Sequence, residues 1–496
     1  IRSSTDLLVS GNGARFTARE PSTGIFRIED ARRIEIRDLE IDYDPLPWTE
    51  GIVESTDPEA GTIVLKVREG FPAPDAPYFT ESRFWGYALD PEVPGRLRYG
   101  TQSHTAFEPP AEPLGDNRFR LRLQEAHRRH AGGLEVGDRF TLLARNEGAY
   151  TTFVEDSEQT TFTRLTTYAS VSGHYVGVRS DAINLLGCRA LIREGRWKGG
   201  NADAVHIQTA RVGPWVEGCH FEGISDDTLV VYTRPYAVET IDGPNEMKLS
   251  RISHGGNRRT EIPESELKTG DQLDFFNPNA DAGYLLATAT VADFDPATGR
   301  IVLTEAFPAL DALREAGPEP VQVFNRTHGQ GYVMRDNRVR NSRRYGLYVK
   351  AGNGLVEGNR FEGLSSKAVA VFNEPAAPNG GFAHGLTLAD NHIRHCGFSA
   401  QYLRKPENAA VSIYAKRFPW DFATEGTAHG PVTLRNNHVD GWILRPYYLG
   451  NIAGLRAVGN RWGPPREVPG YPPAETPFQI VACENVETAD NGPTAP

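Results

Sequence analysis

The chain has 496 residues, of which 39% are hydrophobic and 24% charged, and its formal net charge is −11. A single hydrophobic core rarely serves that length, whereas a repeating architecture has no such limit, because each repeat contacts only its neighbours. No block of Lys and Arg stands out. A nucleic acid is therefore not an expected partner, since its backbone is bound through clustered positive charge.

The composition is that of an all-β protein rich in turns. There are 50 Gly and 35 Pro, and no long helical periodicity is visible. No apolar run approaches the ~20 residues that a membrane span needs. The chain opens at IRSSTDLLV, which lacks a charged n-region and an apolar h-region, so it was either never exported or has lost a signal.

The first segment, 1–48, has the periodicity of short stacked strands. Apolar residues alternate at 25–28 and 34–41, and the second run slips by one position at Arg37-Asp38. Such slips are corners between short strands. This pattern is typical of the rungs of a parallel β-helix rather than of a sandwich.

Two stretches, 49–145 and 235–324, depart from the rung pattern and resemble each other. DPEAGTIVLKV from Asp57 is similar to DPATGRIVL from Asp295, and LEVGDRFTLL from Leu134 is similar to LKTGDQLDFF from Leu267. The two motifs occur in opposite order in the two stretches. We interpret both as small β-barrels inserted into loops of the helix; one long edge sheet is the alternative.

The rungs resume at 146–234 and at 325–496, where one position recurs. It is occupied, in chain order, by Cys188, Cys219, Asn337, Asn359, Asn391, Asn437 and Asn460. Asn at this position can bond its own turn and its stacked copies, which satisfies buried backbone groups. The column predicts a right-handed parallel β-helix. Small buried thiols favour free cysteines at 188 and 219, although stacking also permits a disulfide.

Two of the central strands are each preceded by acid. Asp203 comes before the strand at 204–208, and Asp226 and Asp227 come before the strand at 228–232. Consecutive rungs lie about 4.8 Å apart, so the three carboxylates are expected on one face. Such a cluster suits acid/base hydrolysis of a glycosidic bond, and an inverting pair would need a gap of roughly 6.5–9.5 Å.

Other interpretations of these acids remain open. Asp is also common in turns and caps. Three carboxylates could hold Ca²⁺ in a polysaccharide lyase, with Arg179, Arg196 or Lys198 as base. A non-catalytic glycan-binding β-helix is a third class. Hydrolysis is the interpretation we favour, and no organic cofactor is implied.

Several residues near the same wall are candidates for contacting a sugar. His206 faces outward if Val205 and Ile207 face the core, and Trp197 could stack on a pyranose ring. The further candidates are Arg196, Arg179, Arg234, Glu374, Tyr414 and Lys416.

The order of motifs resembles glycoside hydrolase family 110. The matching motifs are D-Y-x-P at 42–45, N-A-D-A-x-H at 201–206, E-G-C-x-F-x-G-x-x-D-D-x-x-x-V at 217–231, the Asn rungs, and A-V-S-I-Y at 410–414. The resemblance covers about 7–463. It implies a β-helix with inserted barrels, exo-acting and inverting hydrolysis of terminal α-1,3-linked galactose, and Asp203, Asp226 and Asp227 as the catalytic carboxylates.

The chain departs from the family at two places where substrate would be held. Residues 370–385 read AVFNEPAAPNGGFAHG without the family's Cys and Trp, and the double Asp is followed by TLVVYTRP rather than an N-V-H-G ending. We therefore expect terminal α-linked galactose or a related sugar. The expected partner is a carbohydrate, the expected location secreted or periplasmic, and a homo-oligomer is compatible with the sequence.

Overall fold

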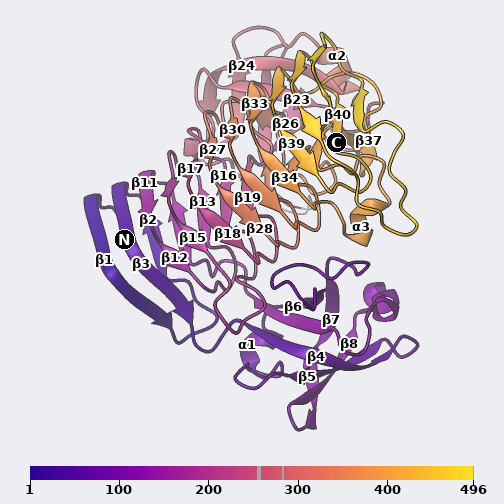
Figure 1. The fold of residues 1–496 in the computed structure, drawn as a ribbon. Helices are drawn as coiled ribbons and strands as arrows, with labels where there is room; N and C mark the ends of the chain where they lie inside the picture. Colours follow the sequence, from indigo (N-terminus) through magenta and orange to yellow (C-terminus); the bar gives the residue numbers. More distant parts are fainter. Residues whose placement is uncertain (254–257, 282–283, 495–496) are drawn as a thin grey trace.

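The computed structural model describes residues 1–253, 258–281 and 284–494. Short parallel strands stack along one axis from the N-terminal to the C-terminal end, and two β modules project from this stack (Figure 1). The chain is therefore a parallel β-helix, as the rung pattern predicts. Among the described residues, no helix is both long and apolar enough to cross a membrane.

The larger helix sheet has 20 strands. They are β1 (Thr5–Ala18), β3 (Arg32–Tyr43), β11 (Glu158–Thr163), β12 (Thr166–Thr167), β14 (Asn184–Leu186), β15 (Arg189–Ala190), β17 (Trp215–Glu217), β18 (His220–Glu222), β27 (Val333–Arg335), β28 (Arg338–Arg340), β30 (Leu355–Glu357), β31 (Arg360–Glu362), β33 (Leu386–Ala389), β34 (His392–Arg394), β38 (Val432–Arg435), β39 (His438–Asp440), β41 (Leu455–Val458), β42 (Arg461–Trp462), β44 (Glu487–Ala489) and β45 (Gly492–Pro493).

The second helix sheet has 10 strands and carries the candidate site. They are β2 (Phe26–Glu29), β10 (Thr152–Glu155), β13 (Tyr175–Val178), β16 (Val205–Gln208), β19 (Leu229–Tyr232), β29 (Leu347–Val349), β32 (Val369–Val371), β35 (Val411–Ile413), β40 (Tyr447–Gly450) and β43 (Phe478–Val481).

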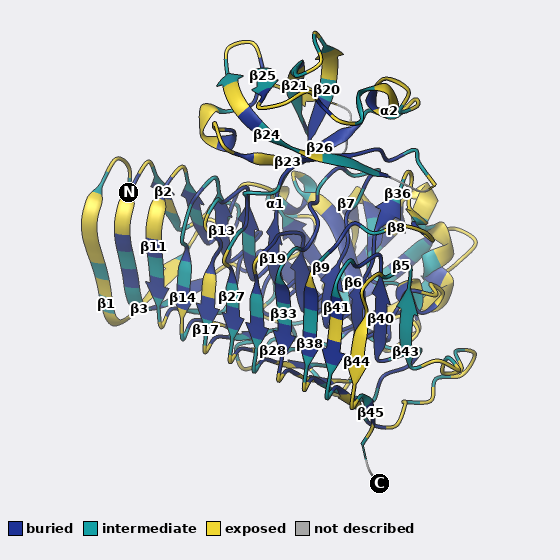
Figure 2. Cartoon of the chain, turned by 90° about the horizontal axis from the view of Figure 1, so that it is seen from above, coloured by how far each residue is buried: buried dark blue, intermediate teal, exposed yellow. Residues whose placement is uncertain are grey.

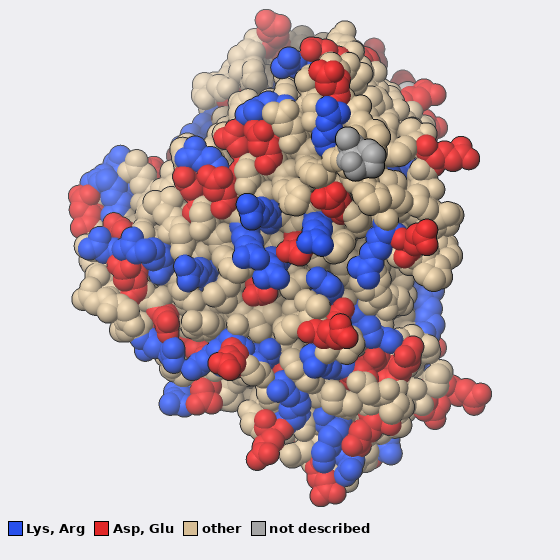
Figure 3. Space-filling model, viewed as in Figure 1, with Lys and Arg blue, Asp and Glu red and all other residues tan. Residues whose placement is uncertain are grey.

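The core runs along the inside of the helix. Alternate residues point inward, so Val205 and Ile207 of β16 are buried in it while His206 faces out. Figure 2 shows the middle rungs largely buried and β1, at the open N-terminal end, largely exposed. On the face viewed in Figure 3, Lys and Arg are interspersed with Asp and Glu.

The Asn column is a continuous hydrogen-bonded ladder, which confirms the prediction. Both the backbone N–H and the Nδ2 of Asn337 donate to Oδ1 of Asn359, at 3.0 Å each, and Asn359 does the same to Asn391. Asn437 and Asn460 continue the ladder, and Oδ1 of Asn337 accepts the N–H of Cys219. Cys188 and Cys219 are free thiols, as the packing argument favours.

The first module is a closed barrel of six strands, β4 (Trp48–Asp57), β5 (Thr62–Val67), β6 (Arg83–Leu89), β7 (Thr105–Gly115), β8 (Arg118–Leu123) and β9 (Arg139–Arg145). The second module contains β20 (Tyr236–Ile241), β21 (Glu246–Ile252), β22 (Arg259–Thr260), β23 (Gln272–Phe276), β24 (Leu285–Asp295), β25 (Arg300–Leu303) and β26 (Gln322–Asn325). The remaining elements are α1 (Pro77–Thr80), α2 (Leu310–Arg314), α3 (Ala400–Leu403), the 3-10 helices η1 (Glu125–Gly133) and η2 (Glu264–Glu266), and the hairpin β36 (Lys416–Arg417) and β37 (Asp421–Phe422).

The two modules share one strand order. The first closes as β4-β5-β8-β7-β6-β9, and in the second the pairings run β20-β21-β25-β24-β23-β26 and return to β20. Both modules are therefore rings of six strands, as expected, rather than one edge sheet. Exchanging the first three strands of either ring with the last three leaves its order unchanged. In each ring the G-D strand, β9 or β23, pairs with a strand of the similar hairpin, β4 or β24, despite the reversed motif order.

Candidate active site

Three acidic residues meet where the chain enters β16 and β19. Val205 pairs with Leu229, which pairs with Leu347 on β29, so the residues just before these strands are also stacked. The nearest carboxylate oxygens of Asp203, Asp226 and Asp227 lie within 4.8 Å of one another. The backbone N–H of Asp227 donates to Oδ1 of Asp203 at 3.1 Å. The turn before β19 thus brings both adjacent acids to the face that Asp203 occupies.

Asp226 is held by three guanidinium groups. Its oxygens lie 2.5 Å from Nη1 of Arg145, 3.1 Å from Nη2 of Arg343 and 3.0 Å from Nη1 of Arg344. Burial opposes ionisation of this carboxyl, but the three positive charges prevail and hold its pKa well below the ordinary range. Asp226 is therefore an ionised and immobilised carboxylate.

Asp227 has the opposite character. Burial, together with the negative charges of Asp226 and Asp203, raises the pKa of this carboxyl to about 8, against the attraction of Arg344. Asp227 consequently keeps its proton near neutral pH. Two adjacent carboxyl groups whose environments push their pKa values apart are typical of acid/base sites.

Asp203 is oriented by a chain of polar contacts on the outer face of β16 and β19. Its Oδ2 lies 2.6 Å from Nδ1 of His206, whose Nε2 lies 3.3 Å from the hydroxyl of Tyr232. That hydroxyl donates to Oε1 of Gln208 at 2.8 Å. His206 thus lies beside the acids, as expected.

A cavity of about 480 Å³ lies between the barrel and the β-helix, and Asp226 lines it. The barrel contributes Arg83, Trp85, His104 and Arg145, and the helix side contributes Arg343, Arg344 and Tyr402. This volume falls within the range of small-molecule sites. The barrel therefore forms one wall of the space beside the acids.

A cluster of lysine and aromatic side chains continues from the acids along the following rungs. Nζ of Lys350 lies 2.9 Å from the carboxylate of Glu374 and 4.0 Å from the ring centroid of Tyr348. Although Glu374 is buried, Lys350 lowers its pKa to about 2. Tyr414 stacks on Phe372 with ring centroids 4.8 Å apart. Glu374 and Tyr414 therefore lie in one group with Lys350.

Four other sequence candidates have partners elsewhere. The ring of Trp197 lies under Arg68 and Arg139 at 4.3 and 5.1 Å, so it packs against the barrel rather than over the acids. The remaining three are Arg196, paired with Asp42 at 2.7 Å, Arg179, paired with Glu155 and Asp156, and Arg234, which lines a different cavity.

The basic residues around the acids escaped the sequence argument. Leu229 pairs with Leu347, so Arg343 and Arg344 occupy the positions before β29 that Ser225 and Asp226 occupy before β19. Comparing SDDTLVVY with RRYGLYVK in rung register could have revealed them. Arg145 could not be found this way, because it comes from the last strand of the barrel, β9.

The arrangement of charges at the acids does not suit a calcium ion. Ca²⁺ takes six to eight oxygen ligands, preferably ionised carboxylates. Here Asp227 keeps its proton, and three arginines already occupy Asp226. A divalent cation at this point would meet strong repulsion from those guanidinium groups.

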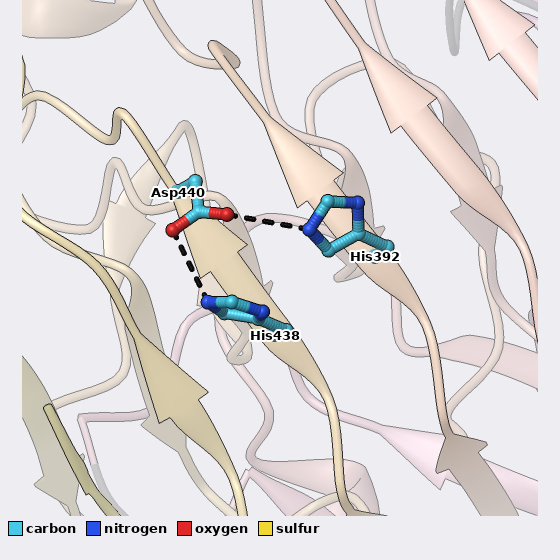
Figure 4. Close-up of side chains that lie close together, drawn as sticks. All are labelled: His392, His438 and Asp440. Carbon is cyan, nitrogen blue, oxygen red and sulfur yellow. Dashed lines mark hydrogen bonds and ion pairs between the residues drawn. The ribbon is translucent and has the colours of Figure 1, made fainter. Parts of the chain in front are cut away.

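A second group of potential metal ligands lies on the larger sheet. Asp440 reaches Nε2 of His438 at 3.1 Å and Nε2 of His392 at 3.3 Å (Figure 4). The stacked position of the two histidines is occupied by Arg360 on the rung before His392 and by Arg461 on the rung after His438. Asp440 therefore balances part of a basic column on the outer surface.

The chain was compared with family models, curated proteins and solved structures. No family model matches the chain. Alpha-1,3-galactosidase B of Akkermansia muciniphila aligns with 97% of this chain at 23% identity. The alignment covers 59% of that relative, so the chain spans about three fifths of its length. The resemblance to α-1,3-galactosidases thus extends over nearly the whole chain.

Solved structures align with the chain only at low identity and low TM-score. A glycoside hydrolase aligns with 98% of this chain and 89% of its own at 12% identity and a TM-score of 0.32. An exopolygalacturonase from Thermotoga maritima aligns with 96% of this chain and 84% of its own at 12% identity and a TM-score of 0.36.

Proposed function

We propose that this protein is an exo-acting glycoside hydrolase that removes a terminal α-linked galactose or a related sugar from a glycan. The observation that carries the proposal is the pairing of a protonated Asp227 with an ionised Asp226 on one rigid face. The whole-length similarity to an α-1,3-galactosidase supports it. The barrel wall beside the acids favours binding of a chain end over binding in the middle of a polysaccharide. A carbohydrate substrate of this kind fits a secreted or periplasmic protein.

In the proposed reaction Asp227 is the general acid. It gives its proton to the glycosidic oxygen as the bond from the anomeric carbon to that oxygen breaks. Asp226, fixed by its arginines, orients the site and keeps the proton on Asp227 through its negative charge. This division of labour follows from the two environments, because only a group that retains a proton at working pH can donate one.

The general base takes a proton from the water that attacks the anomeric carbon. Inversion needs about 6.5–9.5 Å between the two carboxyl groups so that water fits, and the trio is more compact, since its nearest oxygens lie within 4.8 Å. We therefore assign the base to Glu374, which is ionised and lies on the following rungs, and we assign Asp203 to sugar binding with His206.

The first experiment is a screen of aryl glycosides and α-linked galacto-oligosaccharides, with NMR of the first product anomer. We expect a free monosaccharide of inverted configuration. Asp227→Asn and Glu374→Gln should each lower kcat by about 10³-fold or more, whereas Asp116→Asn in an exposed barrel turn should not. Full activity of both Asp226→Asn and Asp227→Asn would contradict the proposed location of the active site. A product of retained anomeric configuration would contradict the assignment of Glu374 as the base.

A lyase is distinguished by its product. It would release an unsaturated sugar that absorbs in the near ultraviolet, and the calcium-dependent kind would lose activity in EDTA. We expect neither, because the arginines around Asp226 oppose a divalent cation. A non-catalytic protein would bind glycan and release nothing.

A further inference from the structure

Two lysines beside the acid cluster are buried without direct contact to a carboxylate of the described residues. Lys367 and Lys416 are 1% and 6% exposed. Neither ammonium group makes a hydrogen bond or an ion pair with any residue in the described ranges. Burying an ammonium group is costly unless it is paired, so two such groups in one place call for an explanation.

The two side chains share an aromatic surrounding. Nζ of Lys367 lies 5.7 Å from the ring centroids of Phe372, Tyr402 and Tyr414, and Nζ of Lys416 lies 4.3 Å from that of Phe372. Ring faces attract a cation but do not replace an anion. Burial accordingly lowers the pKa of Lys367 to about 7 and that of Lys416 to about 8.

The lysines adjoin the proposed catalytic residues. The N–H of Gly346 donates to the carbonyl of Lys367, and the N–H of Thr228 donates to that of Tyr345, so Asp227, Tyr345 and Lys367 stand on successive rungs. Tyr402, one of the rings around Lys367, also lines the cavity beside Asp226. A sugar held against the acids would therefore lie close to Lys367, and Lys416 shares the rings of Phe372 and Tyr414 with Lys367.

The local charges leave a positive excess. Lys350 is neutralised by Glu374, whose negative charge also acts on Lys416. The buried carboxylate of Glu407 acts on both Lys367 and Lys416. Lys405 adds a further positive charge nearby. The adjoining cavity is lined by four arginines against one carboxylate. This concentration of positive charge occurs in a protein whose net charge is −11.

We propose that the sugar taken by this site carries an anionic group, a carboxylate or a sulfate ester, and that Lys367 and Lys416 bind it. The inference rests on the proposed glycoside hydrolysis and names its substrate class. A neutral hydroxyl would leave the excess charge unmatched, whereas one anion would pair with both ammonium groups in a site of low dielectric constant. Charge-assisted bonds of this kind are about twice as strong as neutral ones.

The test measures binding, so it does not depend on hydrolysis. NMR titration of the full chain with galactose, galacturonate and galactose 6-sulfate at pH 6.5 compares a neutral sugar with both kinds of anion. We expect one acidic sugar to bind about 10- to 100-fold more tightly than galactose, and the tighter of the two identifies carboxylate or sulfate. The preference should shrink as the pH rises from 6.5 to 9, because the lysines lose their protons.

Substitution assigns the preference to the two lysines. Lys367→Met and Lys416→Met should each reduce the ratio of acidic to neutral affinity by about tenfold or more, whereas Lys268→Met, an exposed lysine of the second module, should leave it unchanged. If these variants do not fold, the pH dependence of the wild-type preference serves the same purpose. Equal affinity for neutral and acidic sugars, or a preference that survives at pH 9, overturns the proposal. A preference for acidic sugars without any hydrolysis would support the proposed anion binding and contradict the proposed glycoside hydrolase activity.

Discussion

Asp226 and Asp227 are neighbours with opposite tasks, and their partners decide which task each performs. Three arginines keep Asp226 ionised, and burial near two negative charges keeps Asp227 protonated. Neither state belongs to aspartate itself, whose carboxyl is ordinarily ionised at neutral pH. The chemistry at this scale therefore depends on charges supplied by other rungs and by the barrel.

Hydrolysis should decline as the pH rises through about 8. Asp227 must carry the proton that it donates, and above the pKa of this carboxyl that proton is lost. The expected profile of kcat/KM against pH falls by about tenfold per pH unit on its alkaline side. A profile that stays level to pH 10 would contradict the assignment of Asp227 as the acid.

Asp227→Asn should stabilise the fold at alkaline pH while it abolishes activity. The pKa of this carboxyl is about 8 in the folded protein and near 3.8 when unfolded, so between these values the folded state binds the additional proton. The free energy of unfolding therefore falls across this window as the pH rises, and the cost is complete above pH 8. Asparagine has no such cost. We expect a gain on the order of 2 kcal/mol at pH 9 and a smaller one at pH 5, measured by urea unfolding against Asp116→Asn.

At the scale of elements, the stacked turns supply the stability that holds the site. Each Asn of the ladder satisfies the backbone N–H and the side chain of the previous rung, and its own Nδ2 donates to a carbonyl such as that of Met334. The acids before β16 and β19 stand on rungs joined by the same kind of parallel pairing. Rigidity of the stack is what keeps the three carboxyl groups together.

Asn359→Ala should destabilise the protein by about 2–4 kcal/mol. The substitution removes the partner of the backbone N–H of Asn337, of one of the two Nδ2 hydrogens of Asn337 and of the carbonyl of Met334 in a buried site. Each unsatisfied group costs about 1–3 kcal/mol. Asn184→Ala is a matched control, since that side chain is half-buried and makes one bond, to Thr161. Denaturant unfolding measures both variants. If the two substitutions lowered the free energy of unfolding equally, the ladder would contribute no more stability than a single side-chain hydrogen bond.

At the scale of the whole molecule, the barrel is part of the candidate site. Arg145, the last residue of β9, contacts Asp226 at 2.5 Å across 81 residues of sequence. The second module has the same strand order, so the two rings share one architecture. The first ring contributes to the acid cluster because Arg145 lies at its edge and contacts Asp226.

Arg145→Met should lower kcat/KM by about 100-fold without unfolding the barrel. The loss of one of three guanidinium groups frees Asp226 to move, and a shift of about 1 Å near the chemistry can cost that much. Arg118→Met is the matched control, because Arg118 lies on the same barrel and pairs with exposed acids. Circular dichroism and kinetics measure both variants. If Arg145→Met kept wild-type kinetics, the contact between the barrel and Asp226 would have no role in catalysis.

The sequence by itself determined the β-helix, the two inserts and the meeting of Asp203 with Asp226 and Asp227. These features depend on a short repeat, and such a repeat can be recognised from the spacing of residues that are close in sequence. The ring closure behind the reversed motifs of the inserts, the contact of Arg145 with Asp226 and the positive excess around the buried lysines became visible only in the tertiary structure. Arg344 and Asp226 are 118 residues apart, and Arg145 comes from another module. Because electrostatic energies depend on distance in space and on burial, the protonation of Asp227 became visible only once these groups were brought together.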